Sequence, residues 1–143
     1  HYYLVGNHEN YDDMSTLRVD RIAHITVLNE RRKPLREIKG YQQQRTFNVS
    51  QYVKEHIYMF GGESITVTFK ARRSIVNQIL DWFDGNVEFT NITADNVVCR
   101  VRVNHDAFKY WALQYMQSVK VLTPASLVTE VKAAIEEGLH QYS

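Results

Sequence analysis

Tyrosine and arginine side chains able to bind an anionic ligand stand near the beginning of this 143-residue chain. Tyr3 lies in a short apolar run, and Arg18 and Arg21 follow in a segment where polar and apolar residues alternate. Aromatic rings stack on nucleic-acid bases, and guanidinium groups bind phosphates through paired hydrogen bonds. These residue types therefore predict a ligand-binding strand.

The same residues also have a structural interpretation. A tyrosine beside a strand often packs its ring in the core and tethers its hydroxyl, and Asp20 would pair with an arginine to hold the strand in place. Alternation puts Arg18 and Asp20 on one face of the strand and Arg21 on the other, unless a bulge intervenes. Whether the two arginines share one site is left open.

Positive charge is concentrated in one part of the chain. Between Met14 and Lys54 there are nine Lys and Arg residues against three Asp and Glu, a net charge of +6, whereas the whole chain has 17 basic and 16 acidic residues. A local basic field attracts phosphates or acidic partners. The alternative is an ordinary solvated face that carries Lys and Arg.

Motifs of catalysis and of metal binding are not recognisable in this sequence. The six histidines have no metal-ligand spacing, and neither a phosphate-binding glycine loop nor a nucleophile elbow is present. The single cysteine, Cys99, falls on the apolar side of a predicted strand and is interpreted as a packed thiol. We therefore expect a protein that is not an enzyme and that has no metal or organic cofactor. The lone thiol fits a cytoplasmic location, and no apolar run is long enough for a membrane helix.

The hydrophobic pattern after residue 62 predicts the order strand, helix, strand, strand, helix, strand, helix. Strands are expected at Ile65–Phe69, Val87–Phe89, Val97–Val103 and Val119–Val121, and helices from Ser74 to Phe83, from His105 to Tyr115 and from Thr123 to about Gln141. Two βαβ-like halves joined by a hairpin predict an α+β, ferredoxin-like sandwich with an extra C-terminal helix. Trp82 and Trp111 are expected to be largely buried in it.

The first 61 residues have a weaker pattern. Strands are expected at Tyr2–Val5 and Thr16–Leu28, with an uncertain phase near Arg21. Residues 36–48 are polar and have no hydrophobic periodicity, which is typical of a connector. Ser50 is a plausible N-cap of a short helix that ends at about His56.

Two short motifs carry a resemblance to a known family. The run His1-Tyr2-Tyr3-Leu4-Val5-Gly6, followed by Leu17-Arg18-Val19-Asp20-Arg21-Ile22, resembles the WYL domain of bacterial transcriptional regulators. In that family a Trp-Tyr-Leu strand precedes a strand of the form Phe-Arg-Leu-Asp-Arg-Ile, so Tyr2 replaces the tryptophan here. The pattern from Trp111 to Leu122, then Thr123-Pro124-Ala125-Ser126-Leu127, is similar to the C-terminal extension that often follows WYL domains.

The resemblance implies an organisation for the whole chain. Residues 1–40 would be the later strands of a WYL-like, Sm/SH3-like barrel, residues 41–61 a connector with a short helix, and residues 62–143 the ferredoxin-like extension. The chain would then be a C-terminal fragment that lacks the N-terminal DNA-binding domain of such regulators. A partner chain would complete the barrel, or the fragment would leave it open.

The resemblance also implies a function. The chain would be the effector-sensing and dimerisation module of a regulator, a homodimer that binds a nucleotide-like or single-stranded nucleic-acid ligand through Tyr3, Arg18, Asp20 and Arg21. The alternative is an ACT-like module that binds a small metabolite at the ferredoxin-like sheet. That alternative gains if Arg100 and Arg102 line the only pocket.

Overall fold

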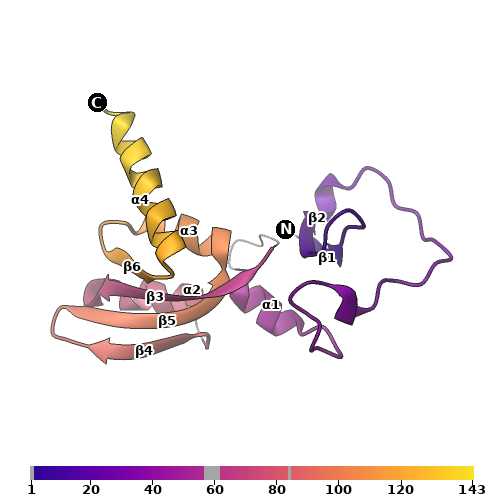
Figure 1. Ribbon diagram of the computed structural model, residues 1–143, viewed down its shortest axis with the longest axis horizontal. Helices are drawn as coiled ribbons and strands as arrows, with labels where there is room; N and C mark the ends of the chain where they lie inside the picture. The colour runs from indigo at the N-terminus through magenta and orange to yellow at the C-terminus, as the bar shows by residue number, and fades with distance from the viewer. Residues whose placement is uncertain (1, 57–61, 84) are drawn as a thin grey trace.

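A computed structural model describes residues 2–56, 62–83 and 85–143. Within these residues the fold is mixed α+β, with two antiparallel sheets and four α-helices. The chain forms an N-terminal lobe, residues 2–56, and a C-terminal unit, residues 62–143, and α1 (Val49–Glu55) lies where the two meet (Figure 1). None of the helices in the described residues is both long and apolar enough to span a bilayer.

The C-terminal unit is built on a four-stranded antiparallel sheet. Its strands have the order β4-β5-β3-β6, so the first and third strands of the unit lie side by side in the middle. The bounds are β3 Ser64–Arg72, β4 Val87–Ile92, β5 Asn96–Asn104 and β6 Val119–Thr123. This arrangement follows the predicted order of elements.

Three helices pack their apolar sides into the core of this unit. They are α2 (Val76–Phe83), α3 (His105–Gln114) and α4 (Ala125–His140). The buried side chain of Asn104 caps α3, because its Oδ1 accepts a hydrogen bond from the Ala107 amide at 2.9 Å. The helix α4 packs against α3 and β6 at its beginning, and its last turns project away from the body (Figure 1).

Alternation along the central strands determines which residues enter the core. Val97, Cys99, Val101 and Val103 of β5 are buried, whereas Arg100 and Arg102 between them are exposed. Trp111 is fully buried, as predicted. Trp82 is only half-buried at the margin of the core, so the expectation for Trp82 was too strong. It lies near the edge of the apolar stripe of α2.

Burial of Cys99 leads to a testable chemical property. The thiol is fully buried, and this burial raises its pKa to about 11. Because the thiolate is the reactive form, native protein should react with iodoacetamide at pH 8 far more slowly than protein in guanidinium. Mass spectrometry of alkylated Cys99 measures both rates. Rapid alkylation of the native protein would contradict the packed position.

The N-terminal lobe has a small sheet and a small core of its own. Strand β1 (Tyr3–Asn7) pairs antiparallel with β2 (Met14–Arg18). Met14, Ile38 and Tyr52 are its buried hydrophobic side chains, and the Tyr52 hydroxyl shares a 2.7 Å hydrogen bond with the hydroxyl of Thr16. This hydrogen bond ties the β1-β2 hairpin to α1.

The predicted strand Thr16–Leu28 is largely wrong. Strand β2 ends at Arg18, Val19–Arg21 forms a turn of 3-10 helix, and residues 22–34 have neither helix nor strand. Ile25 and Val27 are 74% and 92% exposed, although their alternation is typical of a strand. No described strand pairs with this segment. Alternation alone does not form a strand without a neighbouring backbone to pair with.

The short helix α1 was predicted at nearly the right place but with the wrong cap. It begins at Val49, and the side chain of Asn48 accepts a hydrogen bond from the Gln51 amide. The predicted cap, Ser50, lies inside the helix. Residues 57–61 of the predicted connector and His1 of the first motif lie outside the described residues.

Candidate ligand-binding site

Two of the predicted site residues face each other across the N-terminal hairpin. Tyr3 of β1 and Arg18 of β2 are directly opposite in the register of the sheet. Opposite residues in an antiparallel pair have Cβ atoms about 5 Å apart on the same face of the sheet. The pairing therefore puts an aromatic ring beside a guanidinium group, as the ligand-binding interpretation requires.

Asp20 holds the guanidinium group of Arg18 through two hydrogen bonds. Arg18 Nε donates to Oδ1 at 3.0 Å, and a terminal nitrogen of Arg18 donates to Oδ2 at 2.6 Å. The hydrogen bond from Arg18 lowers the pKa of the Asp20 carboxyl, and the pKa of Arg18 is raised in return. The turn of 3-10 helix brings the two side chains together, because Asp20 comes only two residues after Arg18.

Arg21 ends the same turn of 3-10 helix and is exposed. No ion pair or hydrogen bond in the described part of the chain joins it to Tyr3, Arg18 or Asp20. The structure thus brings together Tyr3, Arg18 and Asp20, and it leaves the role of Arg21 as a prediction. The lining residues of the cleft and hollows described below include none of these four.

A cleft of about 160 Å³ lies between the N-terminal lobe and the C-terminal unit. The α1 residue Glu55 meets Arg102 of β5 there, with Arg102 Nε 3.4 Å from Glu55 Oε1. Gln51 also donates a 2.8 Å hydrogen bond to Glu55. This ion pair joins the two parts of the molecule, and residue spacing gives no sign of it because its partners are far apart in sequence.

Uncharged hydroxyl groups and a mixed set of charges line this cleft. Burial raises the pKa of Tyr41 to about 12, and burial also raises the pKa of Tyr52, so both phenols stay protonated at neutral pH. The charged lining residues are Lys39 and Arg102 against Asp13, Glu55 and Glu63. The cleft is therefore slightly acidic, which suits a polar zwitterion better than a phosphate.

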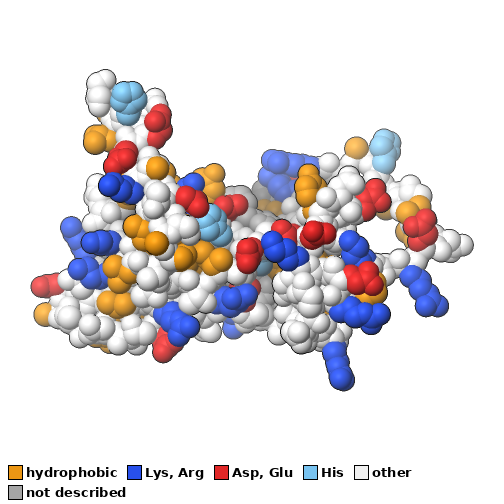
Figure 2. Space-filling view, in the orientation of Figure 1, with side chains coloured by type: hydrophobic (Ala, Val, Ile, Leu, Met, Phe, Trp, Pro, Cys, Tyr) orange, Lys and Arg blue, Asp and Glu red, His pale blue; other side chains and the backbone are white. Residues whose placement is uncertain are grey.

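The basic residues of the N-terminal lobe are mostly unpaired. Of the nine Lys and Arg residues between Met14 and Lys54, only Arg18 forms an ion pair within the described residues. Figure 2 shows several Lys and Arg side chains on this lobe, on the right of the view. Cations without carboxylate partners leave a positive surface potential that attracts anions.

A model of the WCX domain matches residues 62–139. The match covers 78 of the 143 residues, just over half of the chain. The chain belongs to the WCX domain family. This domain is the C-terminal domain associated with WYL domains, so the resemblance to a WYL-domain regulator is confirmed. No curated protein matches the chain.

The WCX domain of this chain extends from the glycine before β3 to the last turns of α4. The motifs around Tyr3 and Arg18, which resemble the WYL domain, lie outside this domain. The cleft receives Gly62, Glu63, Ser64 and Arg102 from the WCX domain and the rest of its lining from the N-terminal lobe. The interface between the two parts is thus itself a candidate site.

Arg100 and Arg102 of the WCX domain do not line the only hollow of the described residues. They share a shallow hollow of about 350 Å³ with Asn86 and Glu88, and Arg102 also reaches the cleft beside Glu55. Further hollows lie in the N-terminal lobe. The ACT-like alternative therefore does not gain from the position of these two arginines. Arg102 nevertheless lines the cleft where a ligand would contact both the N-terminal lobe and the WCX domain.

Proposed function

We propose that the chain is a non-catalytic effector-sensing and dimerisation module of a bacterial transcriptional regulator, and that it binds a nucleotide-like or single-stranded nucleic-acid ligand. Membership in the WCX domain family supports the regulatory role. The observation that supports an anionic ligand is the unpaired positive charge of the N-terminal lobe. Eight of the nine Lys and Arg residues between Met14 and Lys54 have no described carboxylate partner. In this proposal the ligand-dependent signal passes to a DNA-binding domain, and the protein acts in the cytoplasm.

We also propose a finer description of the fold. The order of elements in the WCX domain and the strand order β4-β5-β3-β6, with antiparallel neighbours, support a ferredoxin-like unit with α4 added. The pair β1-β2 would be part of an Sm/SH3-like WYL barrel. A two-stranded hairpin is marginally stable alone, which supports the idea that further strands complete it.

The basic strand should determine the affinity for an anionic ligand. Replacing Arg18 or Arg21 with Ala should weaken binding of a fluorescein-labelled single-stranded oligonucleotide roughly ten- to hundredfold, the range expected for charged hydrogen bonds. The affinity of the unaltered chain should fall with salt, with a slope of about −0.7 in log K against log salt for each phosphate contacted. Fluorescence anisotropy at two salt concentrations, with mononucleotides as competitors, measures both.

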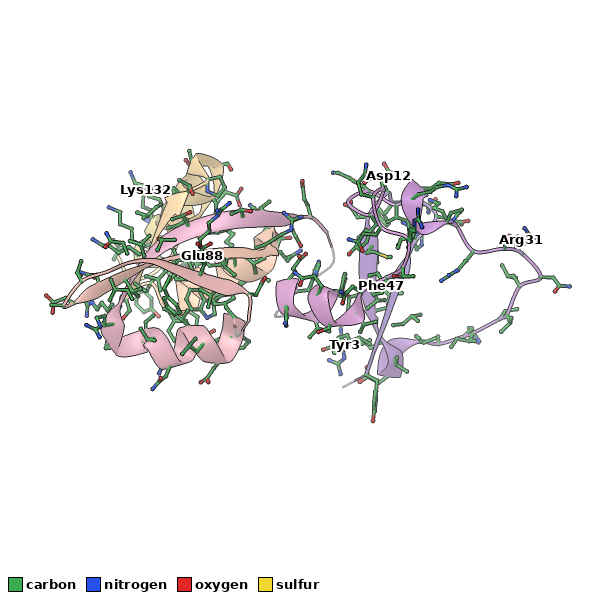
Figure 3. The ribbon with its side chains drawn as sticks, turned by 90° about the horizontal axis from the view of Figure 1, so that it is seen from below. Tyr3, Asp12, Arg31, Phe47, Glu88 and Lys132 are labelled. Carbon is green, nitrogen blue, oxygen red and sulfur yellow. The ribbon has the colours of Figure 1, made fainter. Side chains whose placement is uncertain are left out.

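Three further variants separate binding from stability. Arg31→Ala removes the same charge at the far end of the long loop of residues 22–34 and should change affinity little (Figure 3). Asp20→Asn removes the carboxylate that pairs with Arg18 and leaves the charge of Arg18 in place, so affinity should be retained. Arg→Lys should restore only part of the loss, since Lys lacks the planar fork. Full affinity in both folded alanine variants would exclude this strand as the binding site.

An ACT-like module that binds a small polar metabolite is the second candidate. The cleft beside Glu55 and Arg102 supports it, because its neutral phenols and mixed charges suit a zwitterion such as an amino acid. Calorimetric titration with a panel of amino acids tests this candidate. Binding that Glu55→Gln weakens and Arg18→Ala leaves unchanged would favour it over the nucleic-acid ligand.

Dimerisation is proposed on the basis of the projecting end of α4. Leu139 is 69% exposed there, and Ile135 is exposed one turn before it on the same side of the helix. Apolar groups that project from the body of a protein are typical of contact surfaces. Sedimentation velocity of the chain and of a Leu139→Ser variant would test whether this helix contributes to a homodimer.

A further inference from the structure

A second basic surface in the N-terminal lobe lies at the end of the β1-β2 hairpin opposite to Tyr3 and Arg18, and neither of these two residues lines it. It is a hollow of about 560 Å³, a volume within the range of about 300–1,000 Å³ that small-molecule sites occupy. Met14 and Ile38 form part of its floor and belong to the small core of the lobe. Phe47 and Val49 add further apolar surface, so the floor is apolar.

The rim of this hollow is basic. Arg32, Lys33 and Arg45 line it, and Arg32 and Arg45 also line an adjoining hollow together with Arg36. The described lining residues of the two hollows include no Asp or Glu, and none of these four cations forms an ion pair within residues 2–56, 62–83 and 85–143. Like charges around one hollow repel each other, and a bound anion relieves this repulsion.

The long loop and the connector bring these cations together. Arg32 and Lys33 come just before the turn of 3-10 helix Leu35–Glu37, whereas Arg45 precedes Phe47 and α1. Figure 3 shows Phe47 beside the start of α1, and Arg31 at the outer end of the loop, away from Phe47. The loop thus carries Arg31 outward into solvent and its two neighbours to the rim of the hollow.

We propose that this hollow binds a small amphipathic organic anion, whose carboxylate or phosphate contacts Arg32, Lys33 and Arg45 and whose apolar or aromatic body lies against Met14, Ile38 and Phe47. Charge and size both favour this hollow over the cleft between the lobes, which is smaller and has more carboxylates than cations among its lining residues. This site does not depend on the proposed function, because Arg18 and Arg21 do not line it.

The proposal is tested by calorimetric titration of the whole chain with decanoate, adenosine monophosphate and inorganic phosphate. Decanoate and the nucleotide represent the two sources of this ligand chemistry, a fatty acid and a nucleoside phosphate. At least one of them should bind tenfold or more tightly than phosphate alone, since phosphate lacks the apolar body. Decyltrimethylammonium, which has the decanoate chain length and the opposite charge, should not bind.

Val49→Asp is the sharpest variant for this site. Val49 lines the hollow, is 63% exposed, and is the first residue of α1, where a carboxylate is compatible with the helix. The change adds a negative charge to the hollow and should lower affinity about tenfold or more, the size expected for losing a charge-assisted contact. Arg32→Gln and Arg45→Gln should act in the same direction.

Matched controls separate local from general effects. Val53→Asp makes the same change one helical turn later, outside the lining of the hollow, and Arg31→Gln removes one charge from the outer loop; both should retain affinity. Arg18→Ala and Arg21→Ala should also leave decanoate binding unchanged, so this site and the proposed nucleic-acid site can fail independently. Absence of binding by both organic anions, or an equal loss in Val49→Asp and Val53→Asp, would overturn the proposal.

Discussion

Replacing Trp111 with Ala should destabilise the WCX domain by about 3–5 kcal/mol, the usual cost of removing a buried Trp or Phe ring. Trp111 has no exposed surface and lies at the centre of an aromatic cluster. Its ring centroid is 4.7 Å from that of Phe83, 5.4 Å from that of Phe69 and 5.5 Å from that of Phe108. Urea unfolding followed by circular dichroism measures the loss as a lower midpoint with an unchanged slope.

Two further variants show whether this effect comes from packing. Met116→Ala, at an exposed position in the turn after α3, should change stability by about 0.5 kcal/mol or less. Trp111→Phe should cost much less than Trp111→Ala, because the phenyl ring keeps most of the contacts. The indole Nε1 of Trp111 also has no hydrogen-bond partner among the described residues, and Phe removes this buried polar group. An unchanged urea midpoint in Trp111→Ala would contradict the central position of this ring.

Replacing Tyr52 with Ala should unfold the N-terminal lobe and leave the WCX domain folded. Tyr52 is one of only three buried hydrophobic side chains in the described core of this lobe, so a loss of about 3 kcal/mol, typical of a buried aromatic ring, removes most of its packing. Its ring stacks on His56, with centroids 3.9 Å apart, and contacts Phe47. Hydrogen exchange should show lost protection in residues 2–56 and retained protection in residues 62–143.

The Tyr52→Phe variant isolates the hydroxyl group. It removes only the hydrogen bond to Thr16, which should cost about 1 kcal/mol, and the lobe should remain folded. Thr16→Val should have a similar effect, and the double variant should cost less than the sum of the two. Loss of protection across both parts in Tyr52→Ala would instead show that the lobe and the WCX domain unfold as one unit.

The sequence predicts the helices and strands of the WCX domain well, because the hydrophobic patterns that indicate them are local. The alternation of Val97, Cys99, Val101 and Val103 with polar residues has the period of a pleated strand, and the structure places these four in the core. The helix around Trp111 likewise follows from its apolar spacing. The helix α3 begins at His105, as expected, and the buried Asn104 before it is its N-cap.

The N-terminal lobe shows where local signals fail. Ile25 and Val27 alternate like strand residues, but strand formation needs hydrogen bonds to a second backbone, and no described strand lies beside them. In the same way, Arg18 and Asp20 were expected to share a face, and a turn of 3-10 helix joins them instead. The residue types of the motif can be read from the sequence, whereas their geometry depended on where the strand ended.

The sequence by itself determined the basic character of residues 14–54, the apolar faces of the WCX domain and the motif that contains Tyr3 and Arg18. Only the tertiary structure decided which of these groups meet. Glu55 pairs with Arg102, and Arg32 shares a hollow with Arg45, because the fold brings distant segments to one place. Periodicity reports the neighbours of a residue along its own element, and contacts between elements depend on the packing of the whole chain.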